Sequence, residues 1–205
     1  MRVVRLVAYS DYLCPWCFNA GVRLQRLVDE DPGVEIEWRS YLLRPSPRQR
    51  DLERFRRYTE SWQRPAAEDL SGRFRTWQGG AGPPTHSLPP HLVAKAASRL
   101  GAEAFRTVHD RLFEAYFAES RDITDGETLR ALWGESGLPE AGFEAREDPA
   151  LGREVLAEHE EAQHMGATGV PSVRLADADV VITGALPLET YRRWVERARE
   201  RPANA

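Results

Sequence analysis

Hydrophobic and polar residues follow a few distinct patterns along this chain of 205 residues. Residues 2–9, RVVRLVAY, are rich in β-branched and aromatic side chains, which predicts a buried strand. From Pro15 to Asp29 the apolar positions recur at helical spacing. Residues 34–43, VEIEWRSYLL, alternate and then stop before Pro45, which predicts a second strand. Strand, helix and strand in this order predict a βαβ unit.

The middle of the chain, residues 46–165, predicts helices and contains no convincing strand. Thr124 fits the first position of a capping box, and Asp148 before Pro149 fits the N-cap of another helix. One helical stripe of apolar side chains could line a substrate groove, but core packing is the favoured interpretation. Its members are Phe105, Val108, Leu112, Phe113, Tyr116 and Phe117.

Strand patterns return near the end of the chain. Residues 170–176, VPSVRLA, and 179–183, DVVIT, predict two short strands with a tight connection at 177–178. An amphipathic helix follows Pro187 and is expected to end near Pro202. The predicted order is therefore β-α-β, a large helical insertion, and β-β-α, which is an α/β fold.

This order predicts how the chain divides into domains. Residues 1–45 and 166–205 are expected to form one α/β domain, and residues 46–165 a helical insertion domain. Hydrophobic residues make up 41% and charged residues 29% of the chain, which is typical of a globular protein with a sizeable core.

Charge and hydropathy exclude some classes of partner. The net charge of −4, from 28 basic and 32 acidic side chains, gives no electrostatic case for nucleic-acid binding. No segment approaches the roughly 18 apolar residues of a membrane span. The opening residues MRVVRLVAYSDY lack a small-residue cleavage site. We therefore expect a cytoplasmic protein, in which a permanent disulfide is disfavoured.

The chain has two cysteines, Cys14 and Cys17, which form a C-P-W-C motif where the first strand meets the first helix. Unpaired helical amides and the helix dipole favour a thiolate at Cys14. Cys17 lies one turn further along the same face and is expected to be more sheltered. This asymmetry predicts thiol–disulfide exchange, with an exposed Cys14 as nucleophile and Cys17 as resolving thiol. Pro15 would fix the turn, and Trp16 would offer an apolar platform to a partner peptide.

A zinc site is the metal alternative. Zinc takes four ligands, and His159 and His164 have a suitable spacing for two of them. They lie far along the chain from the cysteines, so the favoured interpretation assigns no metal ligand. A non-catalytic metal-binding or partner-binding module stays open as an alternative.

Taken together, the motifs resemble a known family. A strand, then C-P-W-C at a helix start, then a distant G-V-P-S-V before a strand hairpin resemble the DsbA-like branch of the thioredoxin superfamily. Within it the chain is similar to FrnE-type oxidoreductases, relatives of 2-hydroxychromene-2-carboxylate isomerases and kappa-class glutathione transferases. The resemblance implies a thioredoxin-like fold with a large α-helical insertion. It also implies a cis peptide between Val170 and Pro171 that faces the Cys14 sulfur and docks an extended substrate.

The leading hypothesis is therefore a protein thiol–disulfide oxidoreductase or isomerase without a tightly bound cofactor. Its expected partners are protein disulfides or glutathione, and the apolar faces of the insertion permit a homodimer. The alternative is a glutathione-dependent isomerase or transferase in which Cys14 activates glutathione. Such relatives are expected to carry serine at the first cysteine position and to lack the second cysteine, so Cys17 favours dithiol chemistry. Trp16 supplies no positive charge, and the disulfide is expected to be less oxidising than in periplasmic C-P-H-C proteins.

Residues around the motif are weaker candidates for auxiliary roles. Asp11 could orient the first thiol or cap the turn, and capping is the favoured interpretation. Tyr12 and Asn19 flank the motif as candidate ligand contacts. His86 and His91 are candidate proton shuttles for Cys17, although surface and capping histidines are commoner.

Six arginines follow the second predicted strand closely. They could bind the carboxylates of glutathione. Asp51, Glu53 and Glu60 are interleaved with them, which favours a solvated helix face instead. The six are Arg44, Arg48, Arg50, Arg54, Arg56 and Arg57.

Overall fold

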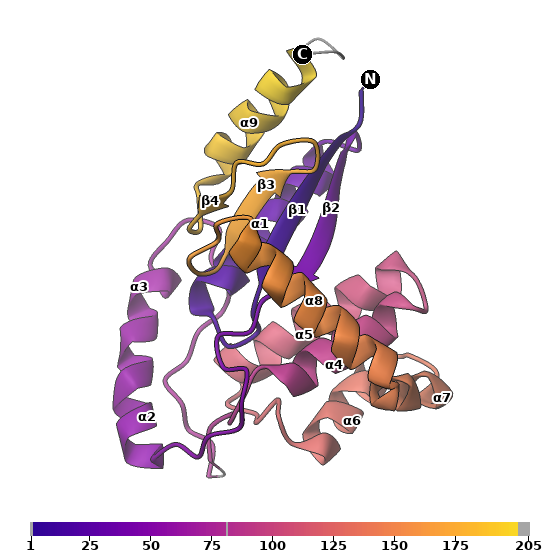
Figure 1. Cartoon of the computed structure of the whole chain (residues 1–205). Helices are drawn as coiled ribbons and strands as arrows, with labels where there is room; N and C mark the ends of the chain where they lie inside the picture. The colour runs from indigo at the N-terminus through magenta and orange to yellow at the C-terminus, as the bar shows by residue number, and fades with distance from the viewer. Residues whose placement is uncertain (1, 81, 201–205) are drawn as a thin grey trace.

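A sheet of four strands with helices around it forms the frame of the computed structural model, which describes residues 2–80 and 82–200 (Figure 1). The order of elements confirms the predicted α/β fold with its long helical insertion. The elements are β1 (Val4–Ser10), α1 (Pro15–Glu30), β2 (Val34–Ser40), α2 (Leu52–Thr59), η1 (Glu60–Trp62), α3 (Gln63–Ala66), α4 (Leu88–Ser98), α5 (Ala102–Phe117), α6 (Gly126–Glu135), α7 (Glu140–Phe143), η2 (Glu144–Glu147), α8 (Pro149–His164), β3 (Ser172–Leu175), β4 (Ile182–Thr183) and α9 (Leu188–Glu200).

The strands lie in the order β2-β1-β3-β4. β1 and β2 are parallel, with Val4 opposite Val34, as a βαβ unit requires. β3 returns antiparallel to β1, with Leu6 opposite Leu175, and β4 pairs antiparallel to β3 at the edge. β1 is thus a central strand, and the chain leaves it directly into the C-P-W-C motif.

Both faces of β1 are buried, which explains why its sequence is an almost continuous apolar run. Leu6 and Ala8 face the cluster that contains α1 and α9. Val7 and Tyr9 face the opposite cluster, to which α8 contributes Ala162. Figure 1 shows α8 crossing in front of the sheet on that side. This double cover fixes the end of β1, and therefore the position of the cysteines.

A second core lies among the helices between β2 and β3. The stripe predicted on residues 105–117 packs there, which confirms the core interpretation. The start of α1 belongs to the same cluster, because the Phe18 ring stacks on the Phe113 ring at 5.2 Å between centroids. Burying one such ring contributes about 1.5–3 kcal/mol. The helical region thus supports the start of α1 directly, while the division into two domains stays a prediction.

The second predicted strand is shorter than expected, because it ends at Ser40. The amide of Leu42 donates to Nδ1 of His159, and the amide of Leu43 donates to the Asp11 carboxylate. These amides therefore bond to side chains instead of continuing the sheet ladder. The result is an irregular segment after β2 that lies against the cysteine turn.

The predicted strand at residues 179–183 was also too long. Two residues pair with β3, where Thr183 lies opposite Ser172, and the residues before them form a longer connection than the predicted tight turn. Val180, in the connection before β4, is 67% exposed. The amide of Gly184 donates to the carbonyl of Pro171 at 2.7 Å and ties this segment to the start of β3.

One helix cap differs from the prediction by a residue. The N-cap of α6 is Asp125, whose carboxylate accepts from the amide of Thr128 at 2.8 Å. Thr124 was expected there, but its hydroxyl donates to Asp122 instead. The aspartate side chain therefore takes over the capping role.

The start of α8 is as predicted. Asp148 caps the helix by accepting from the amide of Ala150, and Pro149 occupies the first helical position. The expected end of the last helix near Pro202 lies outside the described residues. Among residues 2–80 and 82–200, none of the helices has the length and hydropathy needed to cross a bilayer.

Candidate active site

Cys14 is the N-cap of α1, at the junction that the sequence predicts. Its φ of −99° and ψ of 115° are extended, and Pro15 then occupies the first turn of the helix. The Cys14 amide donates to the carbonyl of Asp11 at 3.0 Å, and the Cys17 amide donates to the carbonyl of Cys14 at 3.1 Å. The turn and the first helical bond thereby hold both cysteines at the amino-terminal end of α1.

The two cysteines are free thiols at different depths. Cys17 is fully buried and Cys14 is 5% exposed, so the expected exposed Cys14 was wrong. The Val170 segment lies over Cys14, whose Sγ donates to the Val170 carbonyl at 3.3 Å. Burial raises the pKa of the Cys17 thiol well above its usual range, and the neighbouring Cys14 sulfur raises it further. Cys17 therefore stays protonated at neutral pH until it reacts.

The segment that faces Cys14 contains a cis peptide bond between Val170 and Pro171, as the resemblance implied. Val170 is half-buried, Pro171 is buried, and β3 begins at the next residue. Because its carbonyl contacts the Cys14 sulfur, Val170 brings a backbone acceptor to the reacting atom. The structure thus brings together C-P-W-C and G-V-P, which lie far apart in the sequence.

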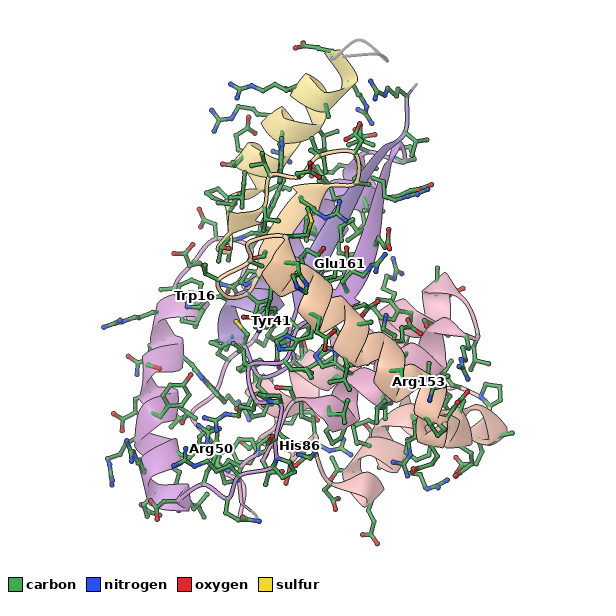
Figure 2. All side chains as sticks on the ribbon, viewed as in Figure 1. Trp16, Tyr41, Arg50, His86, Arg153 and Glu161 are labelled. Carbon is green, nitrogen blue, oxygen red and sulfur yellow. The ribbon has the colours of Figure 1, made fainter. Side chains whose placement is uncertain are left out.

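Pro15 and Trp16 lie on the outer side of the motif. Pro15 is half-buried, while Trp16 is 36% exposed and is one of the few large apolar side chains at the surface. Figure 2 shows Trp16 near the outer edge of the molecule. An exposed indole beside the cysteines fits the predicted platform, although no contact with a peptide is part of this structure.

Asp11 stabilises the cysteine turn from within. Its carboxylate accepts from the amide of Leu13 at 2.7 Å, from the amide of Leu43 at 2.6 Å and from the Ser87 hydroxyl at 2.6 Å. Complete burial raises the pKa of Asp11 to about 6, although the three hydrogen bonds act in the opposite direction. The capping interpretation is confirmed, and the same carboxylate also joins the segments after β2 and before α4. Sequence spacing carries no signal for the Ser87 contact.

Tyr12 and Asn19 both have partners within the protein. The Tyr12 hydroxyl lies 2.9 Å from Nδ1 of His109, deep in the helical core. The Asn19 amide donates to the carbonyl of Pro65, and its oxygen accepts from the amide of Gly72. These contacts support packing around α1, and contact with a ligand stays a prediction for both residues.

The histidines near the site are neutral parts of the packing. Burial lowers the pKa of His91 and of His109 to about 3, so neither carries charge at neutral pH. His91 packs on the Tyr12 ring, with 4.9 Å between centroids. His86 lies beside the Thr85 hydroxyl at 2.9 Å. A role of His86 or His91 as a proton shuttle for Cys17 stays a prediction.

The histidines proposed as zinc ligands lie on α8. His159 accepts from the amide of Leu42, and its ring packs edge-on against Tyr41. His164 is the last residue of the helix. Within the described ranges, no group of three or more His, Cys, Asp or Glu is arranged to hold a metal ion. The zinc alternative therefore gains no candidate site from these residues.

Four of the six clustered arginines line a cavity. Arg44, Arg48, Arg50 and Arg54 border a space of about 650 Å³ beside the cysteine turn. Arg54 and Arg57 on α2 are also exposed, as a solvated helix face requires, and Arg56 pairs with Glu53. The structure thus agrees with a solvated face on α2 and adds a cavity that the sequence does not predict.

The chain belongs to the family of DSBA-like thioredoxin domains, which it matches over residues 5–196. It is similar to the protein YwbO of Bacillus subtilis, with 29% identity over 94% of this chain and 96% of that protein. It also resembles the crystal structure of SCO1869 from Streptomyces coelicolor, described as a probable DsbA oxidoreductase. That similarity has 27% identity and a TM-score of 0.77 over 98% of this chain and 93% of the other.

A third likeness is to the fold of the cytosolic disulfide reductase DsbM from Pseudomonas aeruginosa. It has 20% identity and a TM-score of 0.76, over 95% of this chain and 98% of that chain. The predicted membership of the DsbA-like branch of the thioredoxin superfamily is confirmed, and the family is one of thiol–disulfide oxidoreductases. The FrnE-type assignment within it stays a prediction.

Proposed function

We propose that the chain is a thiol–disulfide oxidoreductase that cycles Cys14 and Cys17 between dithiol and disulfide. The observation that carries the proposal is the contact of 3.3 Å between Cys14 Sγ and the carbonyl of Val170, next to Pro171. It indicates that a substrate strand beside Val170 would lie against the Cys14 sulfur. The depth of Cys17 supports the second role, since a buried thiol attacks only after the first disulfide has formed.

The first step exchanges one disulfide for another. The Cys14 thiolate attacks a sulfur of the substrate disulfide, which forms a bond to Cys14 and breaks the substrate S–S bond. The released substrate sulfur leaves as a thiolate and takes a proton. The product is a mixed disulfide between the protein and its substrate.

The second step resolves the mixed disulfide. Cys17 loses its proton and attacks Cys14 Sγ, which forms the Cys14–Cys17 disulfide and releases the second substrate thiol. The substrate is thus reduced by two electrons and the protein dithiol is oxidised by two. The same steps in reverse oxidise a substrate dithiol.

Glutathione is the co-substrate that we propose for resetting the pair. Two glutathione molecules reduce the Cys14–Cys17 disulfide and leave as glutathione disulfide, so the electrons balance. One structural neighbour, DsbM, has been solved with GSH. A cytoplasmic location fits this direction, because glutathione keeps thiols reduced there.

Pro15, Trp16, Val170 and Pro171 would form the docking surface for an extended substrate. Val170 offers a backbone carbonyl on one side of Cys14, and Trp16 offers an exposed apolar face on the other. Backbone pairing of this kind tolerates many sequences, whereas an aromatic side chain adds apolar contact area.

Trapping the mixed disulfide tests the proposed roles. The Cys17→Ser variant should accumulate a covalent adduct with a disulfide-bonded peptide, because the resolving thiol is missing. The matched Cys14→Ser variant should form no adduct, since buried Cys17 cannot reach the substrate. Intact mass after alkylation measures the amount of adduct in each variant. An adduct on Cys17 in the Cys14→Ser variant, at the same rate, would reverse the assignment.

A further inference from the structure

The arginine-lined cavity begins one residue before the nucleophile. Buried Leu13 and exposed Leu43 both line it, and Leu13 directly precedes Cys14. Arg48, Arg50 and Arg54 lie around the rest of the space of about 650 Å³. Figure 2 shows Arg50 beside α2, below Trp16. A ligand in this cavity would therefore lie next to a substrate that reacts at Cys14.

The positive charge of the cavity is not neutralised by ion pairs. Among the described residues, no salt bridge involves Arg44, Arg48, Arg50 or Arg54, although many other arginines are paired. Asp51 is the carboxylate in the lining, and its Oδ1 accepts from the backbone amide of Arg54 as the cap of α2. Four arginines and one aspartate thus line the cavity, in a protein whose net charge is −4, and the buried Asp11 carboxylate also interacts electrostatically with Arg44.

Backbone bonds hold this arginine segment in place. The amide of Arg44 donates to the Ser87 hydroxyl at 3.0 Å, and its carbonyl accepts from the Ser87 amide at 2.9 Å. The amide of Arg48 donates to the carbonyl of Thr85 at 3.3 Å. Because Ser87 also donates to Asp11, the same anchors join the cavity to the cysteine turn. Pre-arranged donors lower the cost of ordering a ligand.

Arg50 is held against aromatic rings at the floor of the cavity. Its guanidinium lies 4.1 Å from the centroid of Phe55 and 5.8 Å from that of Tyr58. Burial and the nearby charge of Arg44 lower the pKa of Arg50, while Tyr116 acts in the opposite direction. A bound anion would offset the repulsion between the two arginines.

We propose that this cavity binds an acidic segment of a protein substrate, with several carboxylates, while the substrate disulfide reacts at Cys14. Each guanidinium can bind one carboxylate through two parallel hydrogen bonds. Four arginines can therefore bind more carboxylates than the two that glutathione carries. Because Leu13 lines the cavity and directly precedes Cys14, one substrate chain can place its acidic segment in the cavity and its disulfide at Cys14. This inference rests on the proposed function for the reacting disulfide, but the binding site can be tested without the reaction.

A pair of synthetic disulfide-bonded peptides tests the inference. The two share one sequence around the cysteines and differ in a flanking run of Asp and Glu, which the second peptide replaces with Asn and Gln. The cavity variant carries Arg48→Gln and Arg54→Gln. The control variant carries Arg57→Gln and Arg64→Gln, two arginines of the same region that do not line the cavity and change the net charge equally.

The wild type should reduce the acidic peptide about tenfold faster than the amide peptide at low salt. The cavity variant should lose this difference, while the control variant should keep it within about twofold. Loss of the difference in the control variant to the same extent would overturn the inference, because it would indicate a general charge effect. Equal wild-type rates for both peptides would also overturn it. Glutathione disulfide serves as a third probe, and a cavity variant that loses rate with this probe alone would overturn the inference as well.

Binding without chemistry separates this inference from the proposed function. A Cys14→Ser, Cys17→Ser protein should bind the fluorescently labelled acidic peptide about tenfold more tightly than the amide peptide, measured by anisotropy. The added changes Arg48→Gln and Arg54→Gln should remove that preference. Preserved acidic binding in the double serine variant, together with no disulfide reduction by the wild type, would support the cavity and refute the oxidoreductase. Absence of any preference would refute the cavity alone.

Discussion

The cysteine turn and the arginine cavity lie on either side of Leu13 and differ in how their polar and charged groups are paired. At the turn, Cys14, Cys17 and Asp11 are buried, and the Cys14 thiol and the Asp11 carboxylate each bond to a specific protein partner. In the cavity, none of the four lining arginines has an ion-pair partner among the residues that the structure describes. The difference indicates that chemistry depends on enclosed atoms, whereas recognition depends on charges left available for a ligand.

Replacing the nucleophile should give the largest effect. Cys14→Ser should lower the rate of reduction of a small uncharged disulfide by about a thousandfold or more, because the remaining thiol, Cys17, is the deeper of the two and its raised pKa keeps it protonated. The Arg48→Gln, Arg54→Gln variant should keep this rate within about twofold, since a small uncharged disulfide does not need the cavity. Stopped-flow assays of both variants measure the contrast. Comparable losses in the two variants would remove the separation between chemistry and recognition.

Removing the buried carboxylate should give the next largest effect, on stability. Asp11→Ala leaves the amides of Leu13 and Leu43 and the Ser87 hydroxyl without their acceptor. We expect the free energy of unfolding to fall by roughly 3 kcal/mol. Urea denaturation measures the change, and Asp179→Ala at the surface is the control with an expected change within about 0.5 kcal/mol. A fall below about 0.5 kcal/mol in Asp11→Ala would show that the turn does not depend on this carboxylate.

The free energy of unfolding should also depend on pH through the buried His109. Its pKa is about 3 in the folded protein against the usual 6.5, since burial disfavours the charged ring. Between these values the unfolded chain binds a proton that the folded protein does not, so the free energy of unfolding falls as pH falls. His109→Gln should therefore reduce the stability lost between about pH 7 and pH 5 by about 2 kcal/mol.

Urea denaturation of the wild type and of His109→Gln at both pH values measures this difference. Asp11 titrates with the opposite sign, because its raised pKa of about 6 makes the folded protein gain stability as pH falls through that value. Comparing the two proteins cancels this contribution. Identical pH dependence in both would mean that His109 is not held neutral by burial.

The smallest effect should come from the exposed platform. Trp16→Ala should lower the free energy of unfolding by about 1 kcal/mol, because the side chain is only partly exposed, at 36%. The KM for a disulfide-bonded peptide should rise severalfold, whereas the KM for a small disulfide should not change. Steady-state assays with both substrates test this. An equal change for both substrates would place Trp16 in the chemical step instead of in docking.

Local patterns predicted the parts of the fold that local physics determines. The apolar run of β1, the motif at the start of α1 and the Asp148 cap all depend on neighbouring residues, and all lie where the sequence indicates. β2 and β4 were predicted too long, because their ends are decided by tertiary contacts: Leu42 and Leu43 bond to side chains, and β4 has one neighbour.

The site shows the same limit. The position of both cysteines in one helical turn followed from spacing, but the burial of Cys14 depends on the Val170 segment, far along the chain. The arginine cavity was not predicted, because alternating charges do not reveal which side chains line one space with Leu13. Contacts between distant segments therefore determine the burial of Cys14 and the shape of the arginine cavity, which local sequence patterns do not predict.

The redox equilibrium of the cysteine pair tests the central claim most directly. The protein is equilibrated in glutathione buffers, free thiols are alkylated, and intact masses report each state. The account predicts a reversible two-electron transition between Cys14–Cys17 dithiol and disulfide, at about −270 to −120 mV. Failure to form an intramolecular disulfide, with a stable glutathione adduct on Cys14 instead, would contradict it and favour a glutathione-dependent isomerase or transferase.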